Sequence, residues 1–240
     1  MAEAGAPGAE VVQLGRLVAE IHGSGENLVL LHGNGEDARV FDALIAHLPR
    51  FRTIAIEARG HGRTPAGTDP LTIPHLARDL AGALEELGPA RAIVLGFSDG
   101  ANVAMELAVR RPEMMRALVL VGGNLFPAGL RWATRVSLTA GWLGLRVAAV
   151  ASRRARERAE VWRLMTFEPR ISPDALRRIT APTLVVAGEK DMVRLEHSAL
   201  IARMVRGGEL VVVPGVGHFL PTQAPKELGA IIDRFASGLS

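Results

Sequence analysis

Short apolar runs alternate with helical stretches along the chain, and this alternation restricts the possible folds more than any other feature. The runs are four to six residues long and rich in Val, Ile and Leu, and they lack the apolar–polar alternation of a strand with one face in water. Buried strands separated by helices are typical of a mainly parallel sheet with helices on both faces. The six runs span residues 28–31, 53–58, 92–97, 117–121, 183–187 and 210–213.

Two further strands are predicted near the start, at residues 11–14 and 17–22, as an antiparallel pair that turns at Gly15 and Arg16. Helical periodicity predicts the covering helices, such as residues 73–87, which place their leucines on one face and end before Gly88. The predicted fold is α/β, with a mostly parallel central sheet of about eight strands and helices on both faces. The other predicted helices span residues 99–110, 196–205 and 225–235.

The alternation breaks once, between Gly122 and Thr183, in a segment that has no good strand and holds all three tryptophans. Apolar residues at helical spacing there, such as Trp132 and Val136, predict amphipathic helices that form a cap. We therefore predict four segments. They are a disordered tail at residues 1–9, a first core part at residues 10–124, a helical cap at residues 125–180 and a second core part at residues 181–240.

Composition excludes several classes of site. The chain has no cysteine, so disulfides, thiolate metal ligands and a cysteine nucleophile are excluded. Its pI of about 10.4 accompanies a net charge of only +3, because nearly all the cations are Arg and no Tyr or Cys titrates at alkaline pH. This charge does not indicate a nucleic-acid partner. The one arginine cluster, at residues 153–158, is interpreted as a solvated helix face, with an anion- or membrane-surface-binding role as the alternative.

Targeting signals also bear on the class of protein. The first ten residues lack the basic start and the apolar run of a secretory signal. No apolar run reaches the roughly 18 residues that a membrane span needs, and the nearest candidate, residues 130–150, is interrupted by Arg131, Arg135 and Arg146. We expect a cytoplasmic protein without a membrane span, and the oligomeric state stays open.

The stretch at residues 96–100, Gly-Phe-Ser-Asp-Gly, follows a predicted strand and opens a predicted helix. A serine at a sharp strand-to-helix turn adopts strained backbone angles, so the residues two before and two after it must be very small. The turn raises the hydroxyl above the sheet edge, and the helix N-terminus favours negative charge that develops there. The pattern predicts that Ser98 is a nucleophile.

A serine hydroxyl needs a base that takes its proton and a carboxylate that orients the base. His218 follows a predicted strand in a loop of small residues, whereas His47, His75 and His197 lie in predicted helices and are interpreted as surface residues. Asp191 follows the strand at residues 183–187 and is the favoured carboxylate, with Glu189 as the rival. The position after the strand at residues 117–121 offers only Asn124, which has no carboxylate.

A tetrahedral intermediate also needs N–H donors for its oxyanion. The glycine-rich turn at residues 31–35 can aim the backbone N–H of Asn34 at the serine, with the backbone N–H of Asp99 as the second donor. His32 in this turn is interpreted as a structural residue that hydrogen-bonds the loop. No metal-ligand spacing or phosphate-binding loop is present, so we expect no metal and no cofactor.

Together these landmarks resemble the α/β-hydrolase fold family over nearly the whole chain, from Gly15 to Phe235. The resemblance implies a triad of Ser98, Asp191 and His218, an oxyanion hole at Asn34 and Asp99, and a helical cap. Glu57 departs from the pattern, since many relatives have Asp before the Arg-Gly-His-Gly loop. The resemblance rests on residues 32–33, 59–62, 96–100, 188–191 and 217–218.

Within this family, the serine turn and residues 120–124 are similar to the valacyclovir hydrolase-like branch, whose members cleave amino-acid esters. Two interpretations of the Asp99 side chain stay open. It caps the following helix, or it attracts a cationic amino group of the substrate.

The expected function is hydrolysis of a small carboxylic ester through an acyl-enzyme on Ser98, with a small molecule as the binding partner. We expect the tryptophans and leucines of the cap to shape a mostly apolar pocket. Other triad chemistry stays open, namely carbon–carbon bond hydrolysis, peptide or amide cleavage, acyl transfer and cofactor-free perhydrolysis, because the fold does not determine the substrate. A non-catalytic ligand-binding protein is the third interpretation.

Overall fold

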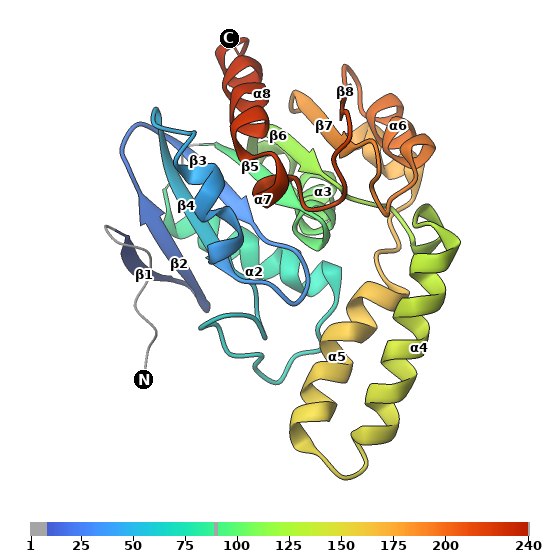
Figure 1. Ribbon diagram of the computed structural model, residues 1–240. Coiled ribbons are helices and arrows are strands. Elements are labelled where there is room, and N and C mark those ends of the chain that lie inside the picture. Colours follow the sequence, from blue (N-terminus) through green and yellow to red (C-terminus); the bar gives the residue numbers. More distant parts are fainter. Residues whose placement is uncertain (1–8, 89–90, 240) are drawn as a thin grey trace.

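The computed structural model describes residues 9–88 and 91–239, so all but the last residue of the predicted tail lies outside the described residues. Eight strands form one sheet (Figure 1). They are β1 (Glu10–Leu14), β2 (Leu17–His22), β3 (Glu26–Leu31), β4 (Phe51–Glu57), β5 (Ala92–Phe97), β6 (Met115–Val121), β7 (Thr183–Gly188) and β8 (Glu209–Val213).

The order of strands across the sheet is β1-β2-β4-β3-β5-β6-β7-β8. Strand β2 pairs antiparallel with β1 and β4, and every other pairing is parallel. The predicted α/β fold with a mostly parallel eight-stranded sheet is confirmed. Strands β3 and β4 begin two residues earlier than their apolar runs, because Glu26 pairs with Phe51 before the runs start.

Helices cover both faces of the sheet (Figure 1). Along β3, Val29 and Leu31 contact one hydrophobic cluster, whereas Leu28 and Leu30 contact the other. Both sets of side chains are buried, which explains why the apolar runs do not alternate with polar residues. The helices are α1 (Asp42–Ile45), α2 (Ile73–Glu86), α3 (Asp99–Arg110), α4 (Trp132–Ala148), α5 (Arg153–Phe167), α6 (Leu195–Met204), α7 (Leu220–Gln223) and α8 (Pro225–Ser237), with the short 3₁₀ helices η1 (Ala38–Phe41), η2 (Pro112–Met114), η3 (Pro127–Gly129) and η4 (Pro173–Arg178).

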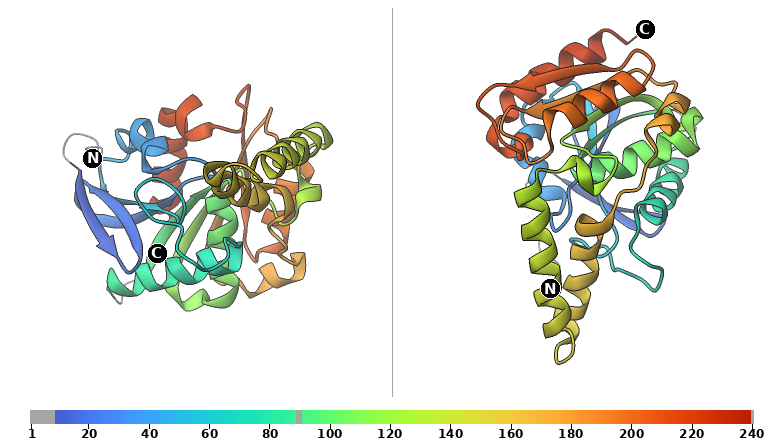
Figure 2. Two further views of the ribbon diagram at one scale, coloured as in Figure 1. Left: turned by 90° about the horizontal axis from the view of Figure 1, so that it is seen from below. Right: turned by 90° about the vertical axis from the view of Figure 1, so that its right-hand side faces the viewer.

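Between β6 and β7, helices α4 and α5 form an antiparallel hairpin that projects from the body of the molecule (Figures 1 and 2). We call this the cap hairpin. A side chain at Gly141 of α4 would overlap the Trp162 ring of α5, so the two helices pack closely there. Trp142 also meets Phe167 edge to face, with ring centroids 4.8 Å apart. Within the described part of the chain, no helix has the length and apolar character to cross a bilayer.

The outer face of α4 differs from the sequence-based expectation. Trp132, one of the tryptophans expected to shape a pocket, is exposed, as is Val136, and both line an open hollow that also includes Phe167 at the end of α5. The reason is that α4 contacts α5 through the opposite side, where Gly141 lies against Trp162. Leu164 of α5, by contrast, is buried against the core.

Candidate active site

Ser98 stands at the turn from β5 into α3, with a backbone φ of +54°. Among the described residues it is the one non-glycine with a positive φ. Two glycines make the turn possible, because a side chain at Gly96 would overlap the Gly100 carbonyl and one at Gly100 would overlap the Leu31 carbonyl. This close backbone packing explains why the residues two positions before and after the serine must be very small.

The structure brings the three predicted triad residues together. His218 Nε2 lies 3.0 Å from Ser98 Oγ, and His218 Nδ1 lies 2.7 Å from Asp191 Oδ1. The Asp191 side chain is fully buried, and its Oδ1 also accepts the Val193 N–H at 2.9 Å. A buried carboxylate on Nδ1 keeps the proton there and leaves Nε2 as an acceptor that faces the serine hydroxyl.

Glu189, the rival carboxylate, has a different position. It is exposed, and its Oε2 accepts the Gly215 N–H at 2.7 Å. The Lys190 N–H donates to the Val216 carbonyl at 2.8 Å, so two hydrogen bonds hold the loop that carries His218. Glu189 therefore positions the histidine loop, and the imidazole itself meets Asp191.

Gly122, which the sequence did not single out, lies directly against the imidazole. It has a φ of +62°, and a Cβ there would lie 2.9 Å from His218 Cε1 and 3.3 Å from Asp191 Oδ2. The position excludes any side chain, because a Cβ would push the ring away from its partners. The consecutive glycines after the strand at residues 117–121 were the only sequence signal for it.

The loop after β3 lies beside the serine. Among the described residues, the backbone N–H groups of Asn34 and Asp99, the two predicted oxyanion donors, have no hydrogen-bond partner. Free N–H groups next to a nucleophile can stabilise an oxyanion. The same loop holds the Glu36 carboxylate, which accepts the Gly33 N–H at 3.0 Å. Burial raises the pKa of Glu36, and the Gly33 N–H lowers it.

His32 holds this loop in place. Its Nε2 accepts the Ala58 N–H at 3.0 Å, so its Nδ1 carries the proton and donates to the Gly33 carbonyl at 2.7 Å. Burial lowers the pKa of His32 to about 4, which keeps the ring neutral. The interpretation of His32 as a structural residue agrees with these contacts.

His197 also is structural, and the prediction of a surface position for it was wrong. It is buried, its Nε2 accepts the Leu125 N–H at 2.9 Å, and burial lowers its pKa to about 4. His47 is exposed and His75 is half-buried.

The Asp99 carboxylate is buried and accepts hydrogen bonds from two side-chain amides, Asn34 Nδ2 at 3.0 Å and Asn102 Nδ2 at 2.9 Å. Burial raises its pKa to about 6, and the two amide hydrogen bonds lower it. Among the described residues, no backbone N–H of α3 donates to this carboxylate, so it does not cap the helix in the predicted way.

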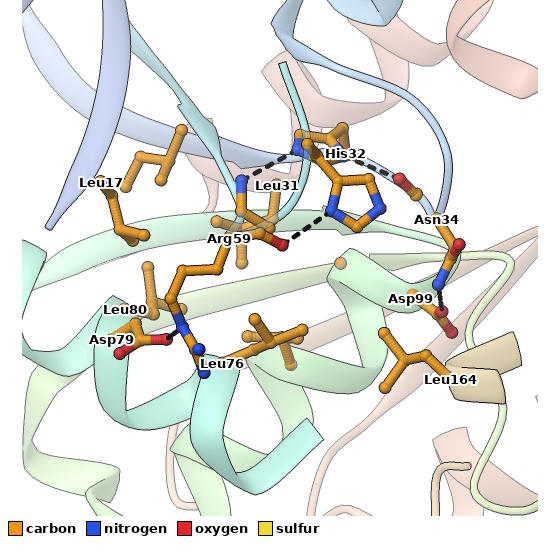
Figure 3. A pocket seen from close by; sticks show the side chains of 16 residues that line it. Leu17, Leu31, His32, Asn34, Arg59, Leu76, Asp79, Leu80, Asp99 and Leu164 are labelled. Carbon is orange, nitrogen blue, oxygen red and sulfur yellow. Dashed lines mark hydrogen bonds and ion pairs between the residues drawn. The ribbon is translucent and has the colours of Figure 1, made fainter. Parts of the chain in front are cut away.

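A small cavity of about 30 Å³ lies beside Asn34 and Asp99, under Leu164 of the cap (Figure 3). This volume is near that of one water molecule, far below the roughly 300 Å³ of a small-ligand pocket. Ser98 is not one of its lining residues, whereas Asn34 and Asp99, which carry the two predicted oxyanion donors, are.

Comparison with known proteins identifies the family. A family model described as the alpha/beta hydrolase family matches residues 28–231. The chain is 28% identical to a protein of Caulobacter sp. (strain K31) with the provisional name carbamate hydrolase RutD, over 92% of this chain and 96% of that protein. It is 26% identical to a 2-(acetamidomethylene)succinate hydrolase of Mesorhizobium japonicum, over 90% of each chain.

Solved structures share the fold. A thermophilic esterase from Thermogutta terrifontis superposes with a TM-score of 0.80 and 22% identity, over 96% of this chain and 99% of that one. At this identity the likeness concerns the fold alone. The family match extends from β3 to α8 and includes the turn at Ser98 and the loops of Asp191 and His218. The chain therefore belongs to the alpha/beta hydrolase family and is a hydrolase of that type.

Proposed function

We propose that the protein hydrolyses a small carboxylic ester through an acyl-enzyme on Ser98. One observation carries the proposal, namely the continuous hydrogen-bond chain from Ser98 Oγ through His218 to Asp191, with distances of 3.0 Å and 2.7 Å. This series of hydrogen bonds ends on the fully buried Asp191 carboxylate, so the imidazole is held in one tautomer and one orientation.

The steps follow from this geometry. His218 Nε2 takes the proton of Ser98 as Oγ attacks the ester carbonyl, and the carbonyl oxygen becomes an oxyanion near the N–H groups of Asn34 and Asp99. The imidazolium then returns its proton to the departing alcohol, which leaves an acyl group on Ser98. Water attacks the acyl group with His218 again as the base, and the carboxylic acid and free Ser98 are released.

Replacing Ser98 with Ala tests the nucleophile. We expect Ser98→Ala to abolish labelling by a fluorophosphonate probe and to lower ester kcat by about 10⁴-fold or more, with unchanged melting. Ser172→Ala removes an exposed serine outside the site and serves as the matched control, with labelling retained. Undiminished labelling of the Ser98→Ala variant would show that Ser98 is not the nucleophile.

A second candidate is hydrolysis of a carbamate, because a relative that matches most of the chain carries the name carbamate hydrolase. The same triad and oxyanion donors can serve either reaction, since both begin with attack on a carbonyl carbon. The candidates are distinguished by measuring kcat/KM for an ester, a carbamate and an amide that share the same acyl group or the same alcohol group. A higher kcat/KM for the carbamate would replace the ester assignment.

Two carboxylates near the nucleophile support a neutral or cationic substrate over an anionic one. A Cβ placed on Gly33 would lie 2.6 Å from Glu36 Oε2 and 3.0 Å from Ser98 Cβ, so Glu36 and the serine border the same small space. Asp99 adds a second carboxyl group, which is buried beside Asn34, whereas Glu36 is half-buried. A substrate carboxylate there would meet like charge at short range. The dicarboxylate named for the Mesorhizobium relative fits this chain poorly.

Replacing Glu36 with Gln tests this charge preference. Gln keeps an acceptor for the Gly33 N–H and removes the charge. At pH 8 we expect Glu36→Gln to raise kcat/KM for an anionic hemisuccinate ester by about fivefold to tenfold, and to leave a neutral acetate ester unchanged. Glu227→Gln removes an exposed carboxylate on α8 and is the control. Equal effects on both esters would contradict a charge filter at Glu36.

A further inference from the structure

The outer face of α4 carries an apolar stripe that nothing in the described molecule covers. Four large apolar side chains are exposed by more than half, and at 100° per residue they fall within about 60° of one another around the helix. Val150 extends the stripe to the tip of the cap hairpin, at 86% exposure. The four are Trp132 (74% exposed), Val136 (55%), Leu143 (52%) and Val147 (76%).

This arrangement is unusual for a surface helix, whose exposed side is normally polar. No residue of α4 is buried, although the helix has 17 residues. The inner side of α4 packs on α5, where Gly141 contacts Trp162. The outer stripe is therefore additional to the contact that holds the hairpin together, and it needs a separate explanation.

Positive charge gathers on the same hairpin. Residues 131–170 contain nine Arg, three Glu and no Asp or Lys, a net charge of +6. The whole chain carries +3, so the remainder of the molecule is net negative at −3. Glu157 and Glu160 are paired with Arg153 and Arg163, and Glu168 accepts a backbone N–H from the core. The hairpin thus presents mostly uncompensated arginines.

These arginines border the stripe. Arg135 and Arg146 lie on α4 next to the apolar positions, and Arg154 and Arg158 lie at the start of α5 near the tip; all four are exposed. Among the described residues, Arg135, Arg154 and Arg158 have no ion-pair partner. An apolar stripe with Trp at one end and arginines along its edge is typical of helices that lie in a membrane interface.

The position of the hairpin suits such contact. It projects from the sheet, and its tip is far from the covering helices of the core (Figure 2). Helix α5 is tied to the core by hydrogen bonds from Asn34 to the Val161 carbonyl and from Arg163 to the Leu71 carbonyl. Helix α4 is therefore the more loosely held member of the pair. Its stripe is open to solvent, and Trp132, Val136 and Leu143 line a hollow that ends at Phe167 of α5.

We propose that the outer face of α4 docks on a lipid bilayer that carries anionic headgroups. The stripe from Trp132 to Val150 enters the boundary between headgroups and acyl chains, and the hairpin arginines contact lipid phosphates. A second copy of this chain is the weaker occupant, because two hairpins of charge +6 would repel each other face to face. The proposal is independent of which bond the active site cleaves.

Vesicle binding by the full chain tests the proposal. We expect co-sedimentation with vesicles of phosphatidylcholine mixed with phosphatidylglycerol, weak binding to pure phosphatidylcholine, and loss of binding as salt rises. All three tryptophans lie in the cap, so binding should shift Trp fluorescence to shorter wavelength. Trp132→Phe should remove most of that shift, because Trp132 is the exposed one of the three.

Paired variants separate the apolar and charged contributions. Two double variants should each weaken binding to anionic vesicles by about tenfold or more. The first combines Leu143→Glu with Val147→Glu, and the second combines Arg154→Gln with Arg158→Gln. Two pairs of exposed residues serve as matched controls and should bind as the wild type does. They are Val11→Glu with Val212→Glu on the edge strands, and Arg203→Gln in α6 with Arg206→Gln just after it. Circular dichroism verifies that each variant is folded.

Three outcomes would overturn the proposal. The first is equal binding to neutral and anionic vesicles, and the second is a hairpin variant that binds no worse than its control. The third is a vesicle-free dimer, seen by sedimentation, that Leu143→Glu with Val147→Glu converts to monomer. That result would assign the stripe to a second copy of the chain.

Discussion

Asn34 joins three parts of the molecule through one side chain and one backbone group. Its Nδ2 donates to the Asp99 carboxylate and to the Val161 carbonyl of α5, both at 3.0 Å. Its backbone N–H, which has no hydrogen-bond partner in the described part of the chain, is a proposed oxyanion donor. Asn34 therefore links the loop after β3, the serine turn and the cap to one another.

Gly122 gives a test at the scale of one residue. We expect Gly122→Ala to lower kcat by about 100-fold, because its Cβ would meet His218 Cε1 and displace the imidazole from Asp191 and Ser98. The free energy of unfolding should fall by only about 1 kcal/mol, from the left-handed backbone. Gly207→Ala is the control, since Gly207 has a φ of +71° and open space around its Cβ position. An equal loss of kcat in both variants would contradict a steric role for Gly122.

At the scale of elements, the two cap helices have different relations to the core. Helix α5 is bonded to the core at its middle and its end, through the Val161 carbonyl, Arg163 and the Glu168 carboxylate, which accepts the Ile73 N–H at 2.9 Å. Helix α4 reaches the core at its start, where the Arg131 N–H donates to the Met192 carbonyl. Along the rest of its length it depends on packing against α5, so that contact determines whether the hairpin keeps its shape.

Two glycines of α4 test this contact with the same substitution. Gly141→Ala should loosen the hairpin, because the methyl group would overlap the Trp162 ring. Gly144 has open space around its Cβ position, so Gly144→Ala should stabilise the helix by about 1 kcal/mol. Trypsin cleavage near Arg154 should be faster in the first variant and slower in the second, with a matching change in Trp fluorescence. Equal cleavage rates would contradict close packing at Gly141.

At the scale of the whole molecule, two buried histidines couple folding to pH. His32 and His197 each accept a backbone N–H, from Ala58 and Leu125, so a proton on the accepting nitrogen would break a buried hydrogen bond. The pKa of each falls from 6.5 to about 4 on burial. A lowered pKa means that the unfolded chain takes up protons first, so their stabilisation is complete above pH 6.5 and is lost as pH falls toward 4.

Unfolding by urea at pH 7 and at pH 4.5 measures this effect. Each histidine shift corresponds to about 3 kcal/mol. Asp99 acts in the opposite direction, because its pKa is raised from 3.8 to about 6 and its contribution grows as pH falls through 6. We expect a net loss of about 3 kcal/mol on acidification. His197→Gln should flatten the profile, whereas His47→Asn, at an exposed position, should not. A wild-type profile that rises toward pH 4.5 would contradict this assignment.

Local sequence signals predicted the strands, the serine turn and the residues of the proposed triad, because each of those features depends on neighbours in the chain. Contacts between distant segments were beyond such signals. Gly122 is constrained by His218, and Glu36 lies beside Ser98; neither relation leaves a periodic pattern. His197 was assigned to the surface because it lies in a helix, although that side of the helix faces Leu125. Periodicity likewise showed which residues of α4 share a face and could not show that Trp132 faces solvent.

The strand that precedes His218, β8, is an edge strand of the sheet. Among the strands that the structure describes, β8 pairs with β7 alone, and its residues before Val213 are exposed or half-exposed. Edge strands open by local fluctuations that cost less free energy than global unfolding, and their amide hydrogens exchange with solvent sooner. Ser98 and Asp191 follow strands with neighbours on both sides, so the proposed base is the member of the triad most exposed to such opening. On warming, hydrolysis should therefore stop before the helices melt.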